Sequence, residues 1–295
     1  SEPGEIARLT QIVQPTIGVM TNIAEEHLEG LVDIDGVLEE EAALFRGMSE
    51  CGIAIVNYDD PYSIKAQHHF AGKIVSFGFD RRATIRASDL VVNAAGSTFR
   101  VNERYTFTLN MLGRHNVSNA LAAIALGWVL GVDIRVMQEA LAAFRPVKMR
   151  SDFERIGKVN VINDCYNANP GSMRAAIQTL SDFRAKKRRI AFLGDMLELG
   201  DAAQRQHWLM GWWIAHRQVD HVVTVGPMME ILAARLQELE IPVDVCASSQ
   251  EAAELAKKLV RAEDTVLVKG SRGMRMEIVT EMIRDKFAKK SLLRR

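Results

Sequence analysis

The sequence is poor in cysteine and has no long apolar run. Its 295 residues include only Cys51, Cys165 and Cys246, and no two of these have the CxxC spacing of a thiolate zinc site. This usage argues against a disulfide framework and favours a reducing compartment, so we expect a cytoplasmic protein. No segment approaches the ~20 apolar residues of a membrane-spanning helix, so we expect no membrane span.

The sequence also lacks a net charge. Lysine plus arginine and aspartate plus glutamate both number 37, which gives a formal net charge of +0 at pH 7. A balanced chain has no general attraction for polyanions, so we expect no nucleic-acid partner and assign any anion binding to local sites. The opening SEPGEIARLT has neither a basic and apolar signal pattern nor an initiator methionine, so we expect the chain to be cut from a longer protein.

Segments typical of strands and helices alternate along the chain. TIGVMTN, GIAIVN and KIVSFGF are strand-like in the first half, and residues 83–112 are rich in β-branched residues with turn signals, which predicts antiparallel strands. After FRPVKMR, a strand-like segment is followed by a helical one five times in succession. This rhythm predicts an α/β protein whose second half forms a parallel, doubly wound sheet.

Polar side chains crowd the segment INDCYNANP at residues 162–170. Asp164, Tyr166, Asn167 and Asn169 stand between a strand-like run and a helix that Pro170 opens. A turn needs only one or two such residues, and strand-to-helix turns are where α/β folds place ligands. The alternative is an Asx-rich turn with proline at the first helical position.

Further candidates stand at other predicted element ends. His27 in TNIAEEHLEG could be a metal ligand or proton carrier, or an exposed loop histidine. Asn116 and Asn119 share a helix face and could bind a purine edge, although Asn116 alone is explained by helix capping. Arg150 could bind phosphate at a domain junction, or form a surface ion pair.

The segment VLVKGSRGM at 266–274 combines Lys269, Ser271 and Arg272 in one loop after a strand. These side chains suit a carboxylate or phosphate ligand. The loop is not a Walker A motif, because lysine precedes glycine and the GxxxxGKS or GxxxxGKT frame is absent. No GxGxxG follows a strand in the second half either, which disfavours a dehydrogenase.

The order of these motifs is more specific than any one of them. TNI-x-x-x-HLEG, LGRHN-x-x-NALAA, a junction arginine, D-x-YNANP-x-SM, LGDM-x-ELG and KGSR-x-x-x-ME follow each other along the whole chain. This pattern resembles the Mur ligase family, and within it the branch that adds D-alanyl-D-alanine to a UDP-N-acetylmuramoyl-tripeptide. The resemblance implies an incomplete central ATPase-type α/β domain with an antiparallel portion over 1–147, followed by a Rossmann-like doubly wound domain over 148–295.

The resemblance also implies a reaction, an ATP-dependent amide ligation in peptidoglycan precursor synthesis. ATP phosphorylates the carboxylate of the UDP-linked peptide, the amine of D-alanyl-D-alanine attacks the acyl phosphate, and a tetrahedral intermediate collapses to amide and phosphate. ATP and Mg²⁺ are the implied cofactors, and we expect a monomer. Positioning and charge neutralisation carry most of such catalysis.

Residue roles follow from the same resemblance. His27 corresponds to a catalytic histidine near the second magnesium ion. His115, Asn116 and Asn119 correspond to the helix that contacts adenine, Arg150 to the arginine that reaches the ATP phosphates, and Asp164 to the ribose-binding aspartate, with Tyr166, Asn167 and Asn169 in the adjoining turn. Lys269, Ser271 and Arg272 correspond to a loop that faces the incoming amino substrate, with Lys269 also a catalytic candidate and Asn169 a further substrate contact.

The sequence departs from the family in two ways. It contains no GKT P-loop and no UDP-gripping first domain, so we expect no ligase activity from this chain alone. Where the family carries a lysine that becomes carbamylated and helps to hold magnesium, this chain has Glu41, or by a one-residue shift Glu40. A glutamate presents the same negative charge on a shorter stem; the alternative is that residues 39–41 form a solvated helix face.

Two other functions remain open. The chain could be a non-catalytic module that binds a nucleotide or peptide, or a ligase of the same superfamily with another amino substrate, such as a folate polyglutamate ligase. A GKT loop upstream in the reading frame would favour a ligase. The amino acid or dipeptide that the enzyme consumes would distinguish among the ligases.

Overall fold

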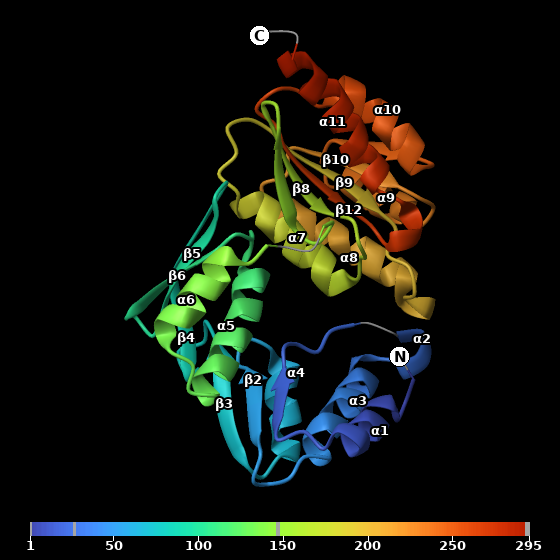
Figure 1. The fold of residues 1–295 in the computed structure, drawn as a ribbon. Coiled ribbons are helices and arrows are strands. Elements are labelled where there is room, and N and C mark those ends of the chain that lie inside the picture. The colour runs from blue at the N-terminus through green and yellow to red at the C-terminus, as the bar shows by residue number, and fades with distance from the viewer. Residues whose placement is uncertain (1, 26–27, 146–147, 293–295) are drawn as a thin grey trace. The chain divides into compact units, whose positions relative to one another are not determined.

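The chain forms two compact units in a computed structural model that describes residues 2–25, 28–145 and 148–292, without the side chains of 28, 29 and 289–292. One unit comprises residues 1–91, 95–110 and 114–144, and the other residues 92–94, 111–113 and 145–295. Each contains helices and a six-stranded, largely parallel sheet, which confirms the α/β fold class (Figure 1). The finer division into domains 1–147 and 148–295 stays a prediction.

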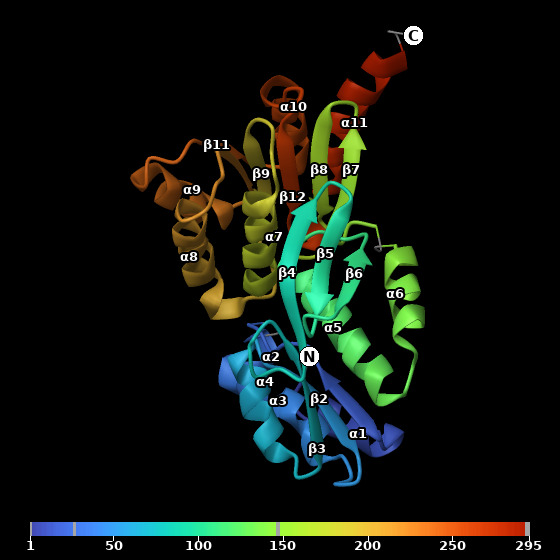
Figure 2. The same cartoon turned by 90° about the vertical axis from the view of Figure 1, so that its left-hand side faces the viewer.

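The sheet of the first unit has the strand order β1-β2-β3-β4-β5-β6. Strands β1 to β4 are parallel neighbours, whereas β5 and β6 pair antiparallel, as residues 83–112 predict. Figure 2 shows these last strands beside one another. Asn102 and Glu103 take positive φ of 49° and 57° in the β5–β6 turn, which lets the chain reverse within a short loop. The strands are β1 Ile17–Met20, β2 Ile53–Asn57, β3 Lys73–Gly78, β4 Ile85–Asn93, β5 Gly96–Val101 and β6 Tyr105–Leu109.

Helices of the first unit bury aromatic and aliphatic side chains against this sheet. Helix α5 packs on β2 and β3, and α6 packs on β6. Phe45, Phe77 and Leu121 are fully buried, and the rings of Phe99 and Phe107 stack with centroids 5.8 Å apart. The described helices are α1 Glu5–Val13, α2 Leu28–Leu31, α3 Ile34–Arg46, α4 Pro61–Ala66, α5 Arg114–Val129 and α6 Ile134–Ala143, with a 3-10 turn at Gln67–His69.

The sheet of the second unit has the strand order β11-β10-β9-β12-β8-β7, and its last strand is the one that runs antiparallel. Strand β12, the last in sequence, lies between β8 and β9. The strands are β7 Asp152–Ile156, β8 Val159–Asp164, β9 Arg189–Gly194, β10 His221–Val225, β11 Val243–Cys246 and β12 Thr265–Lys269. The helices are α7 Pro170–Asp182, α8 Ala203–Ala215, α9 Met229–Glu238, α10 Ser249–Leu259 and α11 Glu277–Leu292, with 3-10 turns at Gly200–Ala202 and Arg272–Met274.

Helices cover both faces of this second sheet. One apolar core joins alternate strand residues such as Ile162 to α7, α8 and α9, and a second joins Val161 and its neighbours to α10 and α11. Because side chains alternate between the two faces of a strand, burial of both faces requires nearly continuous apolar strands. Strand β12, with all five residues buried, shows this pattern.

A buried glutamate fixes the first helix. The Glu40 carboxylate on α3 accepts hydrogen bonds from the backbone N–H groups of Gly4 and Ile6, each at 2.7 Å. The first N–H groups of a helix have no partner within it, and a carboxylate there also suits the helix dipole. Glu40 therefore holds α1 against α3, whereas the neighbouring Glu39 is exposed and pairs with Arg46.

Replacing Glu40 by alanine is therefore expected to destabilise the first unit. Two charge-assisted bonds to helix N–H groups are lost, which costs about 1–2 kcal/mol. The measurement is urea unfolding combined with hydrogen exchange at the Gly4 and Ile6 amides. Glu39→Ala is the matched control, with a cost below about 0.5–1 kcal/mol. Equal losses for the two variants would contradict the capping role.

Candidate functional site

The carboxyl edge of the second sheet brings together residues that lie far apart in the sequence. In the parallel register, Lys269 at the end of β12 stands beside Asp164 at the end of β8 and beside Leu193 of β9. Loops that leave this edge carry most of the residues predicted in the second half. In open α/β sheets this edge is where ligands bind.

Asp164 uses both carboxylate oxygens within the protein. Oδ1 accepts from the backbone N–H of Ser151 at 2.7 Å, and Oδ2 accepts from Nζ of Lys269 at 2.6 Å. The Ser151 hydroxyl also lies 3.4 Å from Oδ1. The aspartate therefore joins the segment before β7 to the end of β12.

Asn167 and Asn169, in the turn after β8, accept hydrogen bonds from backbone N–H groups of the turn and of α7. Asn169 caps α7: its side chain accepts from the N–H of Ser172 at 2.7 Å, and the Ser172 hydroxyl accepts from the N–H of Asn169 at 3.0 Å. The side-chain oxygen of Asn167 accepts from the N–H of Ala168. The Asx-rich turn, with Pro170 at the first helical position, is thus present. Ligand binding by these side chains stays a prediction.

Cys165, inside the same turn, has no accessible thiol. Its side chain is fully buried and its Sγ donates to Oδ1 of Asn163 at 2.9 Å. Burial raises the pKa of Cys165 to about 12, so the group is a neutral thiol near pH 7. Cys165 is therefore not a nucleophile in this site.

Arg150 and Tyr166 form an exposed pair beside the turn. The guanidinium lies 4.2 Å from the ring centroid of Tyr166, whose side chain is 43% exposed. The N–H of Tyr166 donates to the carbonyl of Met149 at 3.0 Å, which keeps the two segments adjacent. A guanidinium held against an aromatic face keeps its edge N–H groups available to anions.

The predicted loop residues Lys269, Ser271 and Arg272 differ in exposure. Lys269 is only 2% exposed and Ser271 is also buried, whereas the Arg272 side chain is 55% exposed. Arg272 lies 3.2 Å from a carboxylate oxygen of Glu277 and 3.7 Å from Sδ of Met149. Arg272 is thus the one of the three whose cationic group is open to solvent.

Asp195 and His207 form a second buried group at this edge, which the sequence analysis did not identify. Asp195 follows β9 and accepts from the N–H of Met229 at 2.8 Å, at the start of α9. His207 must donate from Nδ1 to the carbonyl of Ala203 at 2.7 Å, so its Nε2 accepts from the N–H of Met196 at 3.1 Å. Burial raises the pKa of Asp195 and lowers that of His207. A lone histidine directly before Trp208 on a helix gave no sequence signal, whereas the LGDM segment did.

In the first unit, α5 carries three of the predicted residues. Asn116 is buried, with its Nδ2 3.0 Å from Nε2 of His115, whereas Asn119 is exposed one turn further along. His27 lies outside the described residues. Its predicted roles in catalysis and metal binding stay predictions.

A buried amide that the sequence pattern does not reveal organises this part of the first unit. Nδ2 of Asn57, at the end of β2, donates to the carbonyl of Thr21 at 2.7 Å and lies 3.4 Å from the hydroxyl of Ser118 on α5. Asp60 accepts from the N–H of Ile23 at 2.8 Å. Together they fasten the segment after β1 to β2 and α5. The NYDDP sequence resembles an ordinary turn and helix cap, so only the distant partners reveal this role.

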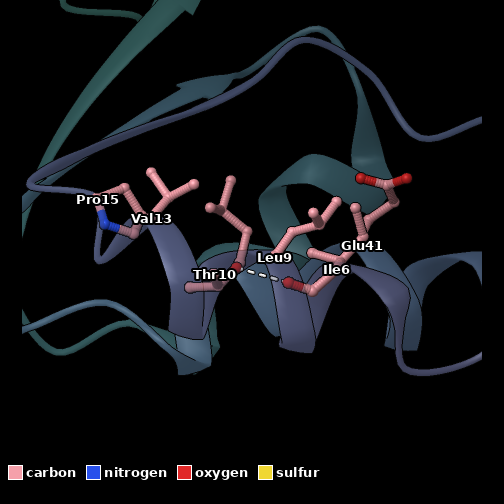
Figure 3. Close-up of a pocket in the computed structure, with 7 residues that line it drawn as sticks. Ile6, Leu9, Thr10, Val13, Pro15 and Glu41 are labelled. Atoms are coloured by element: carbon pink, nitrogen blue, oxygen red, sulfur yellow. Dashed lines mark hydrogen bonds between the residues drawn. The ribbon is translucent and has the colours of Figure 1, made fainter.

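Glu41 lines a pocket of about 190 Å³ between α1 and α3. The other lining residues are mostly aliphatic, and Figure 3 shows Glu41 at one end of the pocket and Pro15 at the other. Mg²⁺ in enzymes often takes only one or two carboxylates and completes its shell with water and substrate phosphates. Glu41 is the one carboxylate in this pocket, and over the described residues no group of three or more histidine, cysteine, aspartate or glutamate side chains could hold a metal ion. The metal role of Glu41 stays a prediction.

Two further structural findings concern membrane-spanning helices and the cysteines. In the part of the chain that the structure describes, no helix has both the length and the apolar character needed to cross a membrane. The three cysteines, all described, are free thiols, and only Cys51 is exposed.

Comparison with known proteins gives two family matches. The Mur ligase middle domain matches residues 1–127, and the Mur ligase, glutamate ligase domain matches residues 150–272. The UDP-N-acetylmuramoyl-tripeptide–D-alanyl-D-alanine ligase of Bacillus subtilis is 30% identical over 289 residues, which cover 97% of this chain and 62% of the relative. The enzyme of the same name from Escherichia coli is 31% identical, with 96% and 63% covered.

Solved structures give the same result. MurF from Acinetobacter baumannii superimposes with a TM-score of 0.86 at 28% identity, over 97% of this chain and 63% of that one. MurF from Thermotoga maritima in complex with ADP superimposes with a TM-score of 0.85 at 23% identity, which shows a shared fold. The chain spans less than two thirds of the length of the curated relatives it matches.

The buried His207 predicts a pH dependence of stability. Its lowered pKa means that the unfolded chain binds a proton near the ordinary value of 6.5, whereas the folded chain does not. The free energy of unfolding therefore falls as the pH falls from about 7 to about 5. His207→Gln keeps an acceptor for the Met196 N–H but does not titrate, so it is expected to flatten this slope. Buried Asp195 is present in both proteins, so the difference in slope reports the titration of His207 together with its charge interaction with Asp195. Identical slopes would contradict the assignment.

Proposed function

Because this chain belongs to the Mur ligase family, we propose that it forms part of an ATP-dependent ligase that joins D-alanyl-D-alanine to a UDP-N-acetylmuramoyl-tripeptide. The main support is that relatives with this name match nearly the whole chain at 30% and 31% identity. The proposed enzyme is cytoplasmic and monomeric and acts in peptidoglycan synthesis.

The proposed chemistry replaces a poor leaving group. The γ-phosphoryl group of ATP is transferred to a carboxylate oxygen of the tripeptide, and ADP leaves. The amine nitrogen of D-alanyl-D-alanine then attacks the acyl carbon and loses a proton. The bond from carbon to the phosphate oxygen breaks, which releases inorganic phosphate and leaves the amide. Such a reaction depends chiefly on orientation and charge neutralisation.

Four side chains of the second unit are assigned to parts of these substrates. We assign Arg150 to phosphate oxygens, because its guanidinium lies against the ring of Tyr166 and can bind bidentately. Asp164 and the adjoining Asn167 are assigned to the ribose side of the nucleotide. Arg272, whose side chain is 55% exposed beside Glu277, is assigned to the carboxylate of D-alanyl-D-alanine.

On α5 of the first unit, an amide is assigned to adenine. Side-chain amides carry a donor and an acceptor and can bind a purine edge. Asn119 is exposed, whereas Asn116 is buried beside His115, so Asn119 is the better candidate for a direct contact. Asn116 and His115 then orient this face of the helix.

A second candidate function is a module that binds nucleotide without turnover. The exposed Arg150 and Asn119 would serve such a module as well. Binding of ATP without consumption would support this reading, and consumption of glutamate or another amino acid would support a different ligase of the superfamily.

The proposed function predicts a three-substrate dependence of phosphate release. The protein translated from the complete reading frame is incubated with ATP, UDP-N-acetylmuramoyl-tripeptide and D-alanyl-D-alanine. Release of phosphate and the pentapeptide product is expected only when all three are present. Product formed equally well from D-alanine or glutamate, or nucleotide binding without product, would contradict the proposal.

The metal role of Glu41 predicts a changed magnesium requirement. Mg²⁺ supplies charge neutralisation at the phosphates when bound, and loss of one anionic ligand weakens its binding. In the same assay, Glu41→Gln is expected to raise the Mg²⁺ concentration for half-maximal rate by about tenfold. Glu39→Gln, an exposed neighbour on α3, is the control. An unchanged requirement in Glu41→Gln would sink the assignment.

A further inference from the structure

We propose that Lys269 and Ser271 are positioning residues that hold the β8 turn, residues 164–169, and that they do not themselves contact the incoming amino substrate. The inference rests on the proposed ligase function. It gives the KGS segment an internal role, whereas the sequence suggests a ligand-binding loop. We call Lys269, Gly270 and Ser271 the clasp.

All the hydrogen bonds that Lys269 Nζ donates go to acceptors in the β8 turn. An ammonium group has three donors. Nζ lies 2.6 Å from Oδ2 of Asp164, 3.0 Å from the carbonyl of Asn167 and 3.4 Å from the carbonyl of Asp164, which stands 105 residues away in sequence. With the side chain 2% exposed, all three donors face these acceptors and the charge is shielded from solvent.

The Ser271 hydroxyl likewise hydrogen-bonds within the protein. Its Oγ donates to the carbonyl of Ala168 at 3.1 Å and accepts from the N–H of Leu197 at 2.9 Å. Its backbone N–H donates to the carbonyl of Asp195 at 3.0 Å. Ser271 therefore joins the end of the β8 turn to the loop after β9.

Gly270 allows this arrangement. A Cβ at this position would lie 2.8 Å from Cγ of Met276 and 3.0 Å from Cα of Gly194, closer than a side chain permits. The close approach of β12 and β9 at this edge therefore requires glycine. Past the ends of the strands no ladder hydrogen bonds remain, so the loop carbonyls need side-chain partners such as these.

Residues 269–272 have different roles: Lys269 and Ser271 position the β8 turn, and Arg272 is assigned to the ligand. Lys269 fixes the start and middle of the β8 turn, where Asp164 and Asn167 are assigned to the nucleotide. Ser271 fixes its end. Arg272, the next residue, is exposed and is the member of the loop that can reach a ligand carboxylate. Loss of Lys269 should therefore affect the nucleotide, and loss of Arg272 the amino substrate.

The same sheet offers a matched control for general destabilisation. At its opposite edge, Nη2 of Arg188 lies 2.6 Å from Oδ2 of Asp264, which is fully buried. This pair matches Lys269–Asp164 in distance and has a buried carboxylate, but its cation is 33% exposed and it lies at the amino ends of β9 and β12. Arg188→Met and Lys269→Met both leave a buried or largely buried carboxylate without its cation, and both are expected to lower the urea midpoint.

The test compares Michaelis constants in the ligase assay. Lys269→Met is expected to raise KM for ATP by about tenfold or more while KM for D-alanyl-D-alanine stays within about twofold. Arg272→Met is expected to raise KM for D-alanyl-D-alanine by about tenfold or more while KM for ATP stays within about twofold. Arg188→Met is expected to leave both Michaelis constants within about twofold of the wild type. A rise in KM for D-alanyl-D-alanine alone in Lys269→Met would overturn the proposal. So would an equal rise in KM for ATP in Arg188→Met.

Hydrogen exchange separates this inference from the proposed function, because it needs no activity. The Ser151 amide reports on Asp164 and the Leu197 amide on Ser271. Exchange at Ser151 is expected to be about tenfold faster in Lys269→Met than in Arg188→Met. If Lys269→Met does not fold, Ser271→Ala replaces it, with the Leu197 amide as reporter. Equal exchange in clasp and control variants would overturn the proposal even where the wild type is an active ligase.

Discussion

A buried ion pair between Lys269 and Asp164 closes the carboxyl edge of the second sheet. The two groups lie 2.6 Å apart, with the lysine 2% and the aspartate 14% exposed. Removing one partner of a buried pair costs about 3–5 kcal/mol, because the other charge is left without compensation. The Asp164 carboxylate is compensated at this edge because β12 places a lysine directly beside it in the parallel register.

The pair determines what the surrounding loops can present. Asp164 also accepts from the N–H of Ser151, so the segment with Met149 and Arg150 is anchored to the same carboxylate. That segment in turn places the Arg150 guanidinium on the ring of Tyr166. Arg150 and Arg272 are both exposed at this edge, which suits phosphates and carboxylates, the anions of the proposed reaction.

Local and long-range parts of this arrangement differ in how far the sequence predicts them. The apolar strands and their helices follow from periodicity, and the α7 cap at Asn169 from Asx and proline preferences. Strand β7 was missed, because DFERI is an edge strand with charged residues and no clear alternation. Helix α1 was missed too, because it is stabilised by a distant residue. The Glu40 carboxylate accepts from the N–H of Ile6, 34 residues away in sequence. The KGS segment has ligand-binding residue types, and only the fold shows that its acceptors lie in the β8 turn.

A double-mutant cycle tests most directly whether Lys269 acts through Asp164. KM for ATP is measured for Lys269→Met, Asp164→Asn and the double variant in the complete ligase. Residues that work through one another give non-additive effects, so the double variant is expected to match the worse single variant within about twofold. Effects that multiply independently would show that Lys269 has a function of its own and would contradict the account.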